Sequence, residues 1–234
     1  MKFDGILLVD KEQGWTSFDI VAKTRNILQQ EYFDKTGEKK KIKVGHCGTL
    51  DPLATGLMII VVGSYCKRAS EFSKLDKVYE VQMKLGETST TGDEEGAKIQ
   101  GSSLRPSKED LGAVLQSFVG ESEQLPPAFS AKKVNGQRAY KLARQGQTVE
   151  LKPQKITIYD IKLSDYAYPY VNFTVKVSSG TYIRSLVEDV GKILKSGAYM
   201  SELSRVKVGN FDLKNAIKVS KVSSKNIIAI DKKD

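Results

Sequence analysis

The sequence is poor in the residues that build metal centres and disulfides. It has a single histidine, His46, so a site made of several histidines is excluded. Its two cysteines, Cys47 and Cys66, form no C-x-x-C pair, which argues against a zinc ribbon or a disulfide framework. No metal site is therefore expected, and any catalytic arrangement that needs an imidazole would have to use His46.

Long apolar runs and phosphate-binding loops are also missing. The longest apolar run, residues 57–62, is far shorter than the roughly 20 residues of a membrane-spanning helix. The first residues lack the apolar stretch of a signal peptide, and no G-x-x-x-x-G-K-[ST] run is present. We predict a soluble, cytoplasmic protein that uses neither a membrane nor a P-loop.

What the sequence has in excess is positive charge. Across 234 residues, 37 Lys and Arg stand against 28 Asp and Glu, a formal net charge of +9. This balance favours a polyanionic partner, with nucleic acid ahead of an anionic membrane surface. A surface that is charged only for solubility is the alternative. The length suits one large domain or two small ones.

Hydrophobic patterning predicts short strands with few crossover helices, hence a mixed α+β sheet fold. The helix that follows the first strand is expected to be capped by Ser17. The predicted strands cover residues 5–10, 57–62, 78–85, 155–163, 171–178 and 199–211. The other predicted helices cover residues 111–118, 138–145 and 181–194, and residues 34–43 and 87–103 are predicted as loops.

The stretch from Lys43 to Pro52, KVGHCGTLDP, surrounds one imidazole and one carboxylate with turn-forming residues. Asp51 can be a turn residue before a proline, which is common. Alternatively, it is a fixed carboxylate on a rigid loop, where catalytic groups concentrate. The residues alone leave both interpretations open.

A resemblance bears on this choice, because VGHCGTLDPLATG is similar to the catalytic motif of the TruB family of tRNA pseudouridine synthases. Glu12 stands where the family's N-terminal signature usually has a proline. The other motifs that resemble the family are DK and GWTS (residues 10–17), KVY (77–79), LPPAFSAKK with Gly136, Arg138, Ala139 and Tyr140, SGTYIRSL (179–186), and Leu203, Arg205, Gly209 and Phe211.

The resemblance implies a mixed, largely antiparallel central sheet, flanked by helices and loops, with an active-site cleft. It implies that a uridine of the tRNA TΨC loop, at position 55 of tRNA, is isomerised to pseudouridine after the base is flipped out. It implies no cofactor and no metal. We expect the T-arm stem-loop of tRNA as the partner and a monomeric enzyme.

The resemblance also assigns roles to single residues. Asp51 matches the essential aspartate, which can attack the ribose C1′, deprotonate C2′ or add to C6 of the base. Arg184 matches the arginine that pairs with this aspartate, and a guanidinium would hold the carboxylate ionised. Tyr79 matches the tyrosine that stacks on the target base. The remaining substrate-binding positions are His46, Tyr182 and Leu203.

Basic residues are concentrated in residues 131–162, where eight Lys and Arg stand against two acidic residues. We predict that Lys132, Lys133 and Arg138 contact the RNA backbone, with a solvated surface as the alternative. The catalytic domain is expected over residues 1–211. Residues 212–234 are expected to be an extension that is too short for a separate RNA-binding domain.

Two rival functions remain on the same scaffold. One is an RNA-binding or tRNA-folding protein without essential catalysis, against which the presence of Asp51, Tyr79 and Arg184 speaks. The other is a synthase directed by a guide RNA. Proteins of that kind usually carry further C-terminal sequence.

Overall fold

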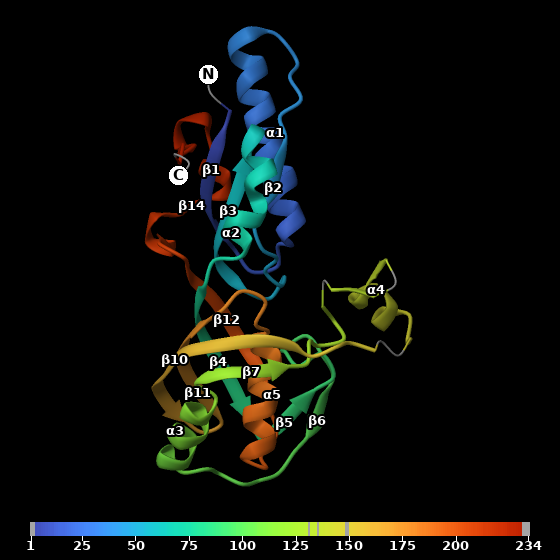
Figure 1. The fold of residues 1–234 in the computed structure, drawn as a ribbon, viewed down its shortest axis with the longest axis vertical. Coiled ribbons are helices and arrows are strands. Elements are labelled where there is room, and N and C mark those ends of the chain that lie inside the picture. Colours follow the sequence, from blue (N-terminus) through green and yellow to red (C-terminus); the bar gives the residue numbers. More distant parts are fainter. Residues whose placement is uncertain (1–2, 131, 135, 148–149, 231–234) are drawn as a thin grey trace. The chain divides into compact units, whose positions relative to one another are not determined.

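The chain divides into two units that interleave along the sequence. In the computed structural model, unit 1 runs to Lys77 and resumes at Ser204, whereas unit 2 holds Val78–Leu203. Unit 1 is thus built from both ends of the chain, which are blue and red in Figure 1. The structure describes residues 3–130, 132–134, 136–147 and 150–230, with the backbone alone at positions 133, 134, 138, 140 and 144.

Unit 1 is a sheet with helices on both faces. Its strand order is β14-β1-β3-β12, where β12 covers Ala198–Val208, and the short strands β2 and β13 pair with β3 and β12. The pair β1–β3 is antiparallel, whereas β14 runs parallel to β1 and β12 parallel to β3. Its elements are β1 (Gly5–Lys11), α1 (Ser17–Thr36), β2 (Val44–His46), β3 (Thr55–Val62), α2 (Ala69–Ser73), β13 (Phe211–Asp212), β14 (Ile217–Lys218) and the 3-10 helices Gly63–Arg68, Leu213–Asn215, Val219–Lys221 and Ser224–Asn226.

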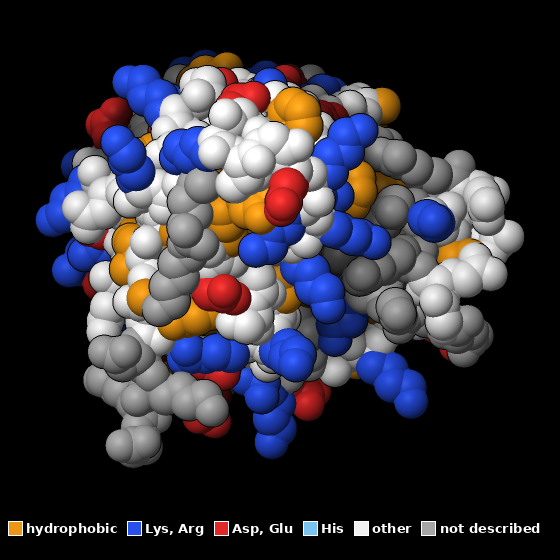
Figure 2. All heavy atoms as spheres, turned by 90° about the horizontal axis from the view of Figure 1, so that it is seen from above, with side chains coloured by type: hydrophobic (Ala, Val, Ile, Leu, Met, Phe, Trp, Pro, Cys, Tyr) orange, Lys and Arg blue, Asp and Glu red, His pale blue; other side chains and the backbone are white. Residues whose placement is uncertain are grey.

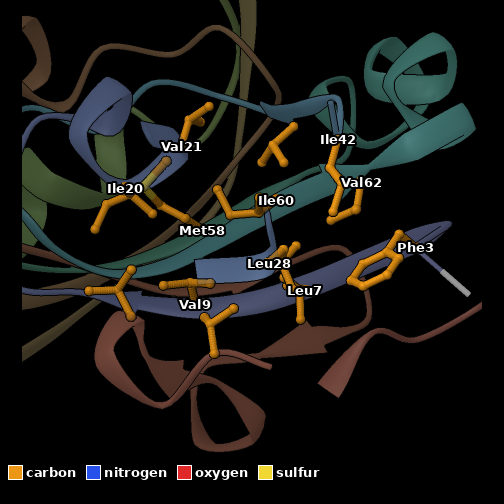
Figure 3. Close-up of a cluster of buried hydrophobic side chains, with 13 residues drawn as sticks. Phe3, Leu7, Val9, Ile20, Val21, Leu28, Ile42, Met58, Ile60 and Val62 are labelled. Atoms are coloured by element: carbon orange, nitrogen blue, oxygen red, sulfur yellow. The ribbon is translucent and has the colours of Figure 1, made fainter. Parts of the chain in front are cut away.

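The run of apolar residues in β3 is continuous because both faces of the strand are buried. Met58, Ile60 and Val62 face α1 and pack with its residues, as Figure 3 shows. Leu57, Ile59 and Val61 lie in a second cluster, which includes Phe72 of α2. The predicted strand over residues 57–62 is therefore confirmed.

The boundaries of α1 differ from those expected. Thr16, not Ser17, is the N-cap, because its Oγ1 accepts a hydrogen bond from the backbone N–H of Asp19 at 3.1 Å. The Asp19 carboxylate in turn accepts from the backbone N–H of Thr16 at 2.9 Å, which completes a capping box. The helix continues to Thr36 and ends at Gly37, which has a φ of 71°. The first three residues of the predicted loop over residues 34–43 therefore belong to the helix.

Unit 2 is a mainly antiparallel sheet of order β12-β4-β11-β10-β7, with two separate hairpins, β5–β6 and β8–β9. β12 begins in unit 2 and ends in unit 1. The elements are β4 (Lys77–Leu85), β5 (Glu87–Ser89), β6 (Lys98–Gln100), α3 (Lys108–Ser117), β7 (Gly120–Gln124), β8 (Lys133–Val134), β9 (Gln137–Arg138), α4 (Ala139–Arg144), β10 (Gln154–Ala167), β11 (Tyr170–Val177), α5 (Ile183–Ile193) and β12 (Ala198–Val208).

The fold class predicted from the sequence is confirmed, since strands and helices mix and most strand pairs are antiparallel. The helix predicted over residues 181–194 is also confirmed: α5 covers Ile183–Ile193 and buries Ile183, Leu186, Val187 and Val190. The prediction of a loop throughout residues 87–103 is wrong, because this segment contains the β5–β6 hairpin. No helix in the described ranges is both long and apolar enough to cross a bilayer.

Candidate active site

Asp51 lies on the loop that joins β2 to β3, two antiparallel neighbours in unit 1. The loop makes a turn at this residue, since the backbone N–H of Ala54 donates to the carbonyl of Asp51 at 3.1 Å. A second bond, from the Gly14 N–H to the Pro52 carbonyl at 2.8 Å, ties the loop to the segment before α1. The side chain of Asp51 is half-buried. A carboxylate is thus presented on a loop with a defined backbone.

Ser17 holds the residue immediately before Asp51. The buried Ser17 hydroxyl donates to the carbonyl of Leu50 at 3.0 Å and accepts from the Leu50 N–H at 2.8 Å. Both backbone polar groups of Leu50 are therefore bonded to one side chain. The serine that the sequence suggested as a helix cap serves this loop instead.

Lys11, at the end of β1, is fully buried. Its ammonium group donates to the carbonyls of Glu12 at 3.1 Å, Trp15 at 2.8 Å and Pro52 at 3.1 Å. Burying a charge is costly unless it is well bonded, and these carbonyls provide that bonding. Lys11 thereby links the Asp51 loop to the turn that precedes α1.

Arg205 bonds the other side of the loop. This residue of β12 is 3% exposed, and its Nε donates to the Leu57 carbonyl at 2.7 Å. Its terminal nitrogens reach the carbonyls of Thr49 and Gly48, each at 3.4 Å. β12 can approach this closely because Gly56 has no side chain: a Cβ there would lie 2.5 Å from the Arg205 carbonyl oxygen, at a φ of 106°.

His46 ends β2 and is half-buried. Its Nδ1 lies 3.4 Å from the backbone nitrogen of Gly48, which donates to it. This bond places the histidine at the start of the Asp51 loop. The two residues predicted from the VGHCGTLDP stretch thus belong to one local structure in unit 1.

Arg184 lies in the first turn of α5 in unit 2, where a positive charge opposes the helix dipole. It is 5% exposed. Its Nη1 donates to the carbonyl of Thr91 at 3.1 Å and its Nη2 to that of Phe129 at 2.9 Å. The carboxylate of Asp93, equally buried, lies 3.5 Å from Nη1. This carboxylate compensates the buried charge within the unit.

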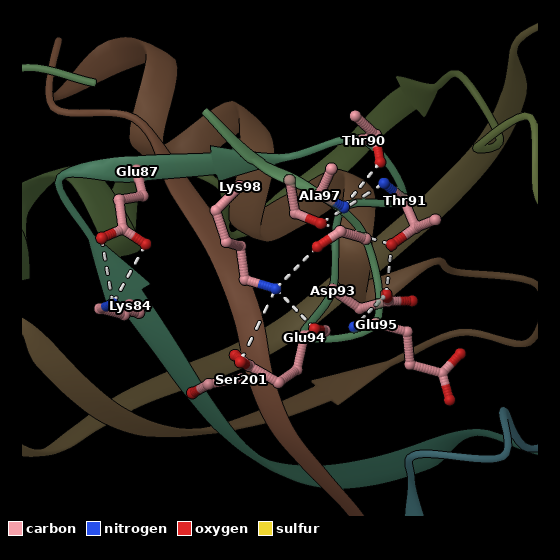
Figure 4. Close-up of polar contacts among 12 residues, drawn as sticks. Lys84, Glu87, Thr90, Thr91, Asp93, Glu94, Glu95, Ala97, Lys98 and Ser201 are labelled. Atoms are coloured by element: carbon pink, nitrogen blue, oxygen red, sulfur yellow. Dashed lines mark hydrogen bonds and ion pairs between the residues drawn. The ribbon is translucent and has the colours of Figure 1, made fainter. Parts of the chain in front are cut away.

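Asp93 is itself held by the turn that follows β5 (Figure 4). Its carboxylate accepts from the Thr91 hydroxyl and, at 3.1 Å, from the backbone N–H of Glu95. Sequence reasoning missed this residue, because the polar segment around it has the composition of a surface loop. The run Thr-Gly-Asp at residues 91–93 was the available signal, since an Asp in a turn commonly bonds the backbone two residues on.

Arg184 and Tyr182 are brought together at the start of α5. Tyr182 is the N-cap residue, and its backbone is fixed by Gln124, which is 5% exposed. The Tyr182 N–H donates to Gln124 Oε1 at 2.8 Å, and Gln124 Nε2 donates to the Tyr182 carbonyl at 2.9 Å. This amide clamp sets where α5 begins.

Tyr79 and Leu203 are buried residues of β4 and β12, which are neighbouring strands in unit 2. The predicted site residues therefore form two groups. Asp51 and His46 belong to unit 1, and Tyr79, Tyr182, Arg184 and Leu203 belong to unit 2.

The three predicted phosphate contacts lie near the β8–β9 hairpin of unit 2. Lys132 is half-exposed, and its carbonyl accepts from the Ala139 N–H at 2.7 Å. Lys133 and Arg138 pair across the hairpin, but their side chains lie outside the described part of the chain. Their role stays a prediction.

Burial shifts several pKa values. Burial lowers the pKa of Lys77 to about 8, and nearby Arg205 adds to that effect. Burial raises the pKa of the Cys47 thiol to about 12 and also raises that of the Glu188 carboxyl on α5. Across the ranges that the structure describes, no group of three or more His, Cys, Asp or Glu could hold a metal ion.

The fold is shared with solved structures of longer chains. The chain superposes on the Cbf5 complex with Nop10 and Gar1 with a TM-score of 0.70 and 26% identity, covering 93% of this chain and 53% of that one. On an H/ACA ribonucleoprotein bound to a substrate RNA containing 2′-deoxyuridine, the TM-score is 0.66, at 24% identity, and the coverage is 92% and 51%. The chain thus spans about half of each of these neighbours.

Sequence comparison identifies the family of this chain. Residues 35–183 match the N-terminal domain of TruB family pseudouridylate synthases, and residues 184–234 match the tRNA pseudouridylate synthase B C-terminal domain. The chain is 43% identical to tRNA pseudouridine synthase B of Clostridium kluyveri, covering 96% of this chain and 74% of that protein. It is 42% identical to the Bacteroides fragilis protein of that name, covering 92% and 91%. The chain belongs to the TruB family of pseudouridylate synthases.

Proposed function

We propose that this protein isomerises a uridine of tRNA to pseudouridine, and that the target lies in the TΨC loop, at position 55 of tRNA. The observation that carries the proposal is the identity of 43% over 96% of the chain with a protein named tRNA pseudouridine synthase B. The intact residues Asp51, Tyr79 and Arg184 support catalysis over RNA binding alone.

The reaction is an exchange of glycosidic bonds. The bond between N1 of uracil and C1′ of ribose breaks, the base turns, and a bond from C5 to C1′ forms. The hydrogen on C5 then leaves as a proton and N1 gains one, so substrate and product are isomers. No redox partner is needed. A base inside a folded loop must first be flipped out of its stack.

We assign Asp51 as the catalytic carboxylate. It can attack C1′, deprotonate C2′ or add to C6, and each route needs a carboxylate held in place. The bonds from Ser17, Lys11 and Arg205 to the loop backbone support this assignment, because they fix the backbone on both sides of Asp51.

The residues of unit 2 are proposed to serve the same reaction. Arg184 supplies a positive charge that is anchored by Asp93 and two carbonyls. Tyr79 is proposed to stack on the target base, and Tyr182 and Leu203 to contact the substrate. His46 of unit 1 is proposed to contact the RNA beside the flipped base.

The backbone of the T-arm is proposed to meet the basic region at residues 131–162, where Lys132, Lys133 and Arg138 would contact phosphates. Phosphate contacts release counterions, so binding there would weaken as salt rises.

The test is incubation of the purified protein with an unmodified tRNA transcript, followed by mapping of pseudouridine. The proposal expects pseudouridine at the TΨC-loop uridine, without added cofactor. The matched control is the same transcript with cytidine at that position, which should yield none there. Product at another position only would overturn the assigned target, and tight binding without product would favour the RNA-binding rival.

A second substrate separates catalysis from binding. Fluorine at C5 cannot leave as a cation, so a 5-fluorouridine target permits the early steps and blocks the last one. Mass spectrometry of the digested RNA should show a rearranged or hydrated fluorinated nucleoside, or a trapped complex. Recovery of only intact 5-fluorouridine, with binding confirmed, would contradict the enzyme proposal.

A further inference from the structure

A hollow on unit 1 lies over the second half of α1. The helix contributes three amide side chains and one aromatic ring to it, and the segment that follows the helix contributes three consecutive lysines. The residues that line it are Asn26, Gln29, Gln30, Phe33, Lys39, Lys40 and Lys41. Its lining therefore combines positive charge, hydrogen-bonding groups and an exposed ring.

One buried residue, Ile42, anchors the end of the lysine segment in the core that contains α1 residues. Gly37 reverses the chain at a φ of 71°, and the segment then returns beside the helix to β2, as Figure 1 shows. Ile42 is 3% exposed and packs in the α1 core, whereas its neighbours Lys41 and Lys43 are exposed. This alternation of exposed lysines with a buried isoleucine fixes which side chains of the segment face solvent.

The charge of this surface is strongly positive. Residues 34–43 contain five lysines and two acidic residues, Asp34 and Glu38. Asp34 accepts a hydrogen bond from Gln30 Nε2 at 2.7 Å, which ties that carboxylate to the helix. The Nζ of Lys40 lies 5.0 Å from the centroid of the Tyr32 ring, a cation–π contact that orients the lysine. Figure 2 shows the molecule from above relative to Figure 1, with Lys and Arg side chains at several places on that face.

Phe33 is the feature that a surface built only for solubility does not need. Its side chain belongs to the hollow and is 42% exposed. An exposed ring beside lysines is the combination that proteins use for unpaired nucleotides, because the base stacks on the ring while cations meet the phosphates. Amide side chains next to the ring can bond the edges of a base.

We propose that this hollow is a second RNA-binding site, which takes an unpaired nucleotide and its flanking phosphates. Lys39, Lys40 and Lys41 bind the phosphates, and Phe33 stacks on the base. The proposal rests on the proposed function in one respect, since RNA is the polyanion that such an enzyme meets.

The test compares two triple variants by tRNA binding over a range of salt. The first replaces Lys39, Lys40 and Lys41 with alanine. The control replaces three other exposed lysines of unit 1, Lys67, Lys74 and Lys214, which lie on or beside the elements that cover the opposite face of the β1–β3 pair. Both variants lose the same charge. Unfolding temperature and circular dichroism verify that both are folded.

For the first variant we expect Kd to rise about ten-fold, and the slope of log K against log salt to fall by roughly 0.7–0.9 for each phosphate that the protein no longer binds. The control should stay near the wild type. Equal weakening of binding in both variants would show a general effect of charge and overturn the proposal, as would unchanged binding by the first variant.

Phe33→Ala separates an RNA site from a site for any polyanion. This variant should bind tRNA about five-fold more weakly or worse, because the ring on which the base stacks is removed. Its binding of heparin, which has charge but no bases, should be unchanged, whereas the lysine variant should bind both more weakly. Unchanged tRNA binding by Phe33→Ala would overturn the nucleotide site.

The outcome is separable from that of the proposed function. At saturating tRNA the lysine variant should form pseudouridine at the wild-type rate, with the defect confined to KM. Absence of product from the wild type would refute the enzyme proposal while leaving the binding comparison valid.

Discussion

In unit 1, buried cations bond the backbone around an acidic residue, whereas in unit 2 a buried carboxylate bonds the side chain of a basic one. Lys11 and Arg205 donate to carbonyls of the Asp51 loop. Asp93 lies against the guanidinium of Arg184. The first arrangement sets the course of a loop, and the second sets the charge balance and orientation of one side chain.

The difference predicts different failures. Removal of a cation in unit 1 takes one hydrogen-bond donor from each of several carbonyls, which costs stability and loosens the loop. Removal of Asp93 in unit 2 takes away the carboxylate that compensates a buried guanidinium, and breaking buried ion pairs is costly. Substitutions in the two units can therefore be ranked by their expected effect on catalytic rate or on the free energy of unfolding.

The largest effect is expected for Asp51→Asn, which keeps the shape of the side chain and removes its charge. Single-turnover pseudouridine formation should fall by about a thousand-fold or more. Binding of tRNA and the unfolding temperature should barely change, because the side chain is half-buried and the loop is held by other residues. Asp165→Asn, at an exposed position of β10, is the matched control. Substantial turnover by the Asp51 variant would refute its assignment.

Asp93→Asn should come next. It removes the carboxylate beside Arg184, and we expect a decrease of about 3 kcal/mol in the free energy of unfolding by urea. The control is Asp160→Asn, which breaks an exposed pair with Lys162 at 3.3 Å and should cost less than about 0.5 kcal/mol. Equal costs for the two would show that Asp93 does not support the guanidinium.

Lys11→Met tests the backbone clamp of unit 1. Three carbonyls lose a donor, so the free energy of unfolding should fall by about 2 kcal/mol, and the rate of catalysis should fall less than in the Asp51 variant. Lys218→Met, which breaks half-exposed pairs with Asp10 and Glu12, should cost about 1 kcal/mol at most. A stable, fully active Lys11 variant would contradict the clamp.

The smallest effect concerns pH. Burial lowers the pKa of Lys77 to about 8 from its ordinary 10.5, so between these values the unfolded chain binds more protons than the folded one. Stability contributed through this group therefore rises as pH rises from 8 to 9, by an amount on the order of 1 kcal/mol. Urea unfolding of wild type and Lys77→Met over this range should show the gain only in the wild type. Parallel pH curves would refute it.

Periodic patterns of apolar residues in the sequence predict most of the fold. The apolar run of β3 and the spacing of Ile183, Leu186, Val187 and Val190 are local signals, and each predicts its element correctly. The bounds of α1 do not follow from such signals, because Thr16 and Ser17 are both good caps and only tertiary structure gives Ser17 another partner.

The supporting residues of the site left no comparable signal. Arg205 bonds the carbonyl of Leu57, 148 positions away in sequence, and a side chain that bonds distant backbone imposes no period. Asp93 lies in a polar turn that looks like many others in sequence. The family resemblance named Asp51 and Arg184, but what holds each of them follows from the fold.

Interleaving of the units has a consequence for synthesis of the chain. Unit 2 is continuous in sequence and has all its residues once Leu203 has left the ribosome, whereas unit 1 waits for its second segment. Ile6 exchanges two hydrogen bonds of 2.9 Å with Ile228, close to the other end of the chain. The Asp51 loop gains its Arg205 bonds only after that residue has emerged, so this loop is completed late and after long-range closure, the slow kind of contact to form.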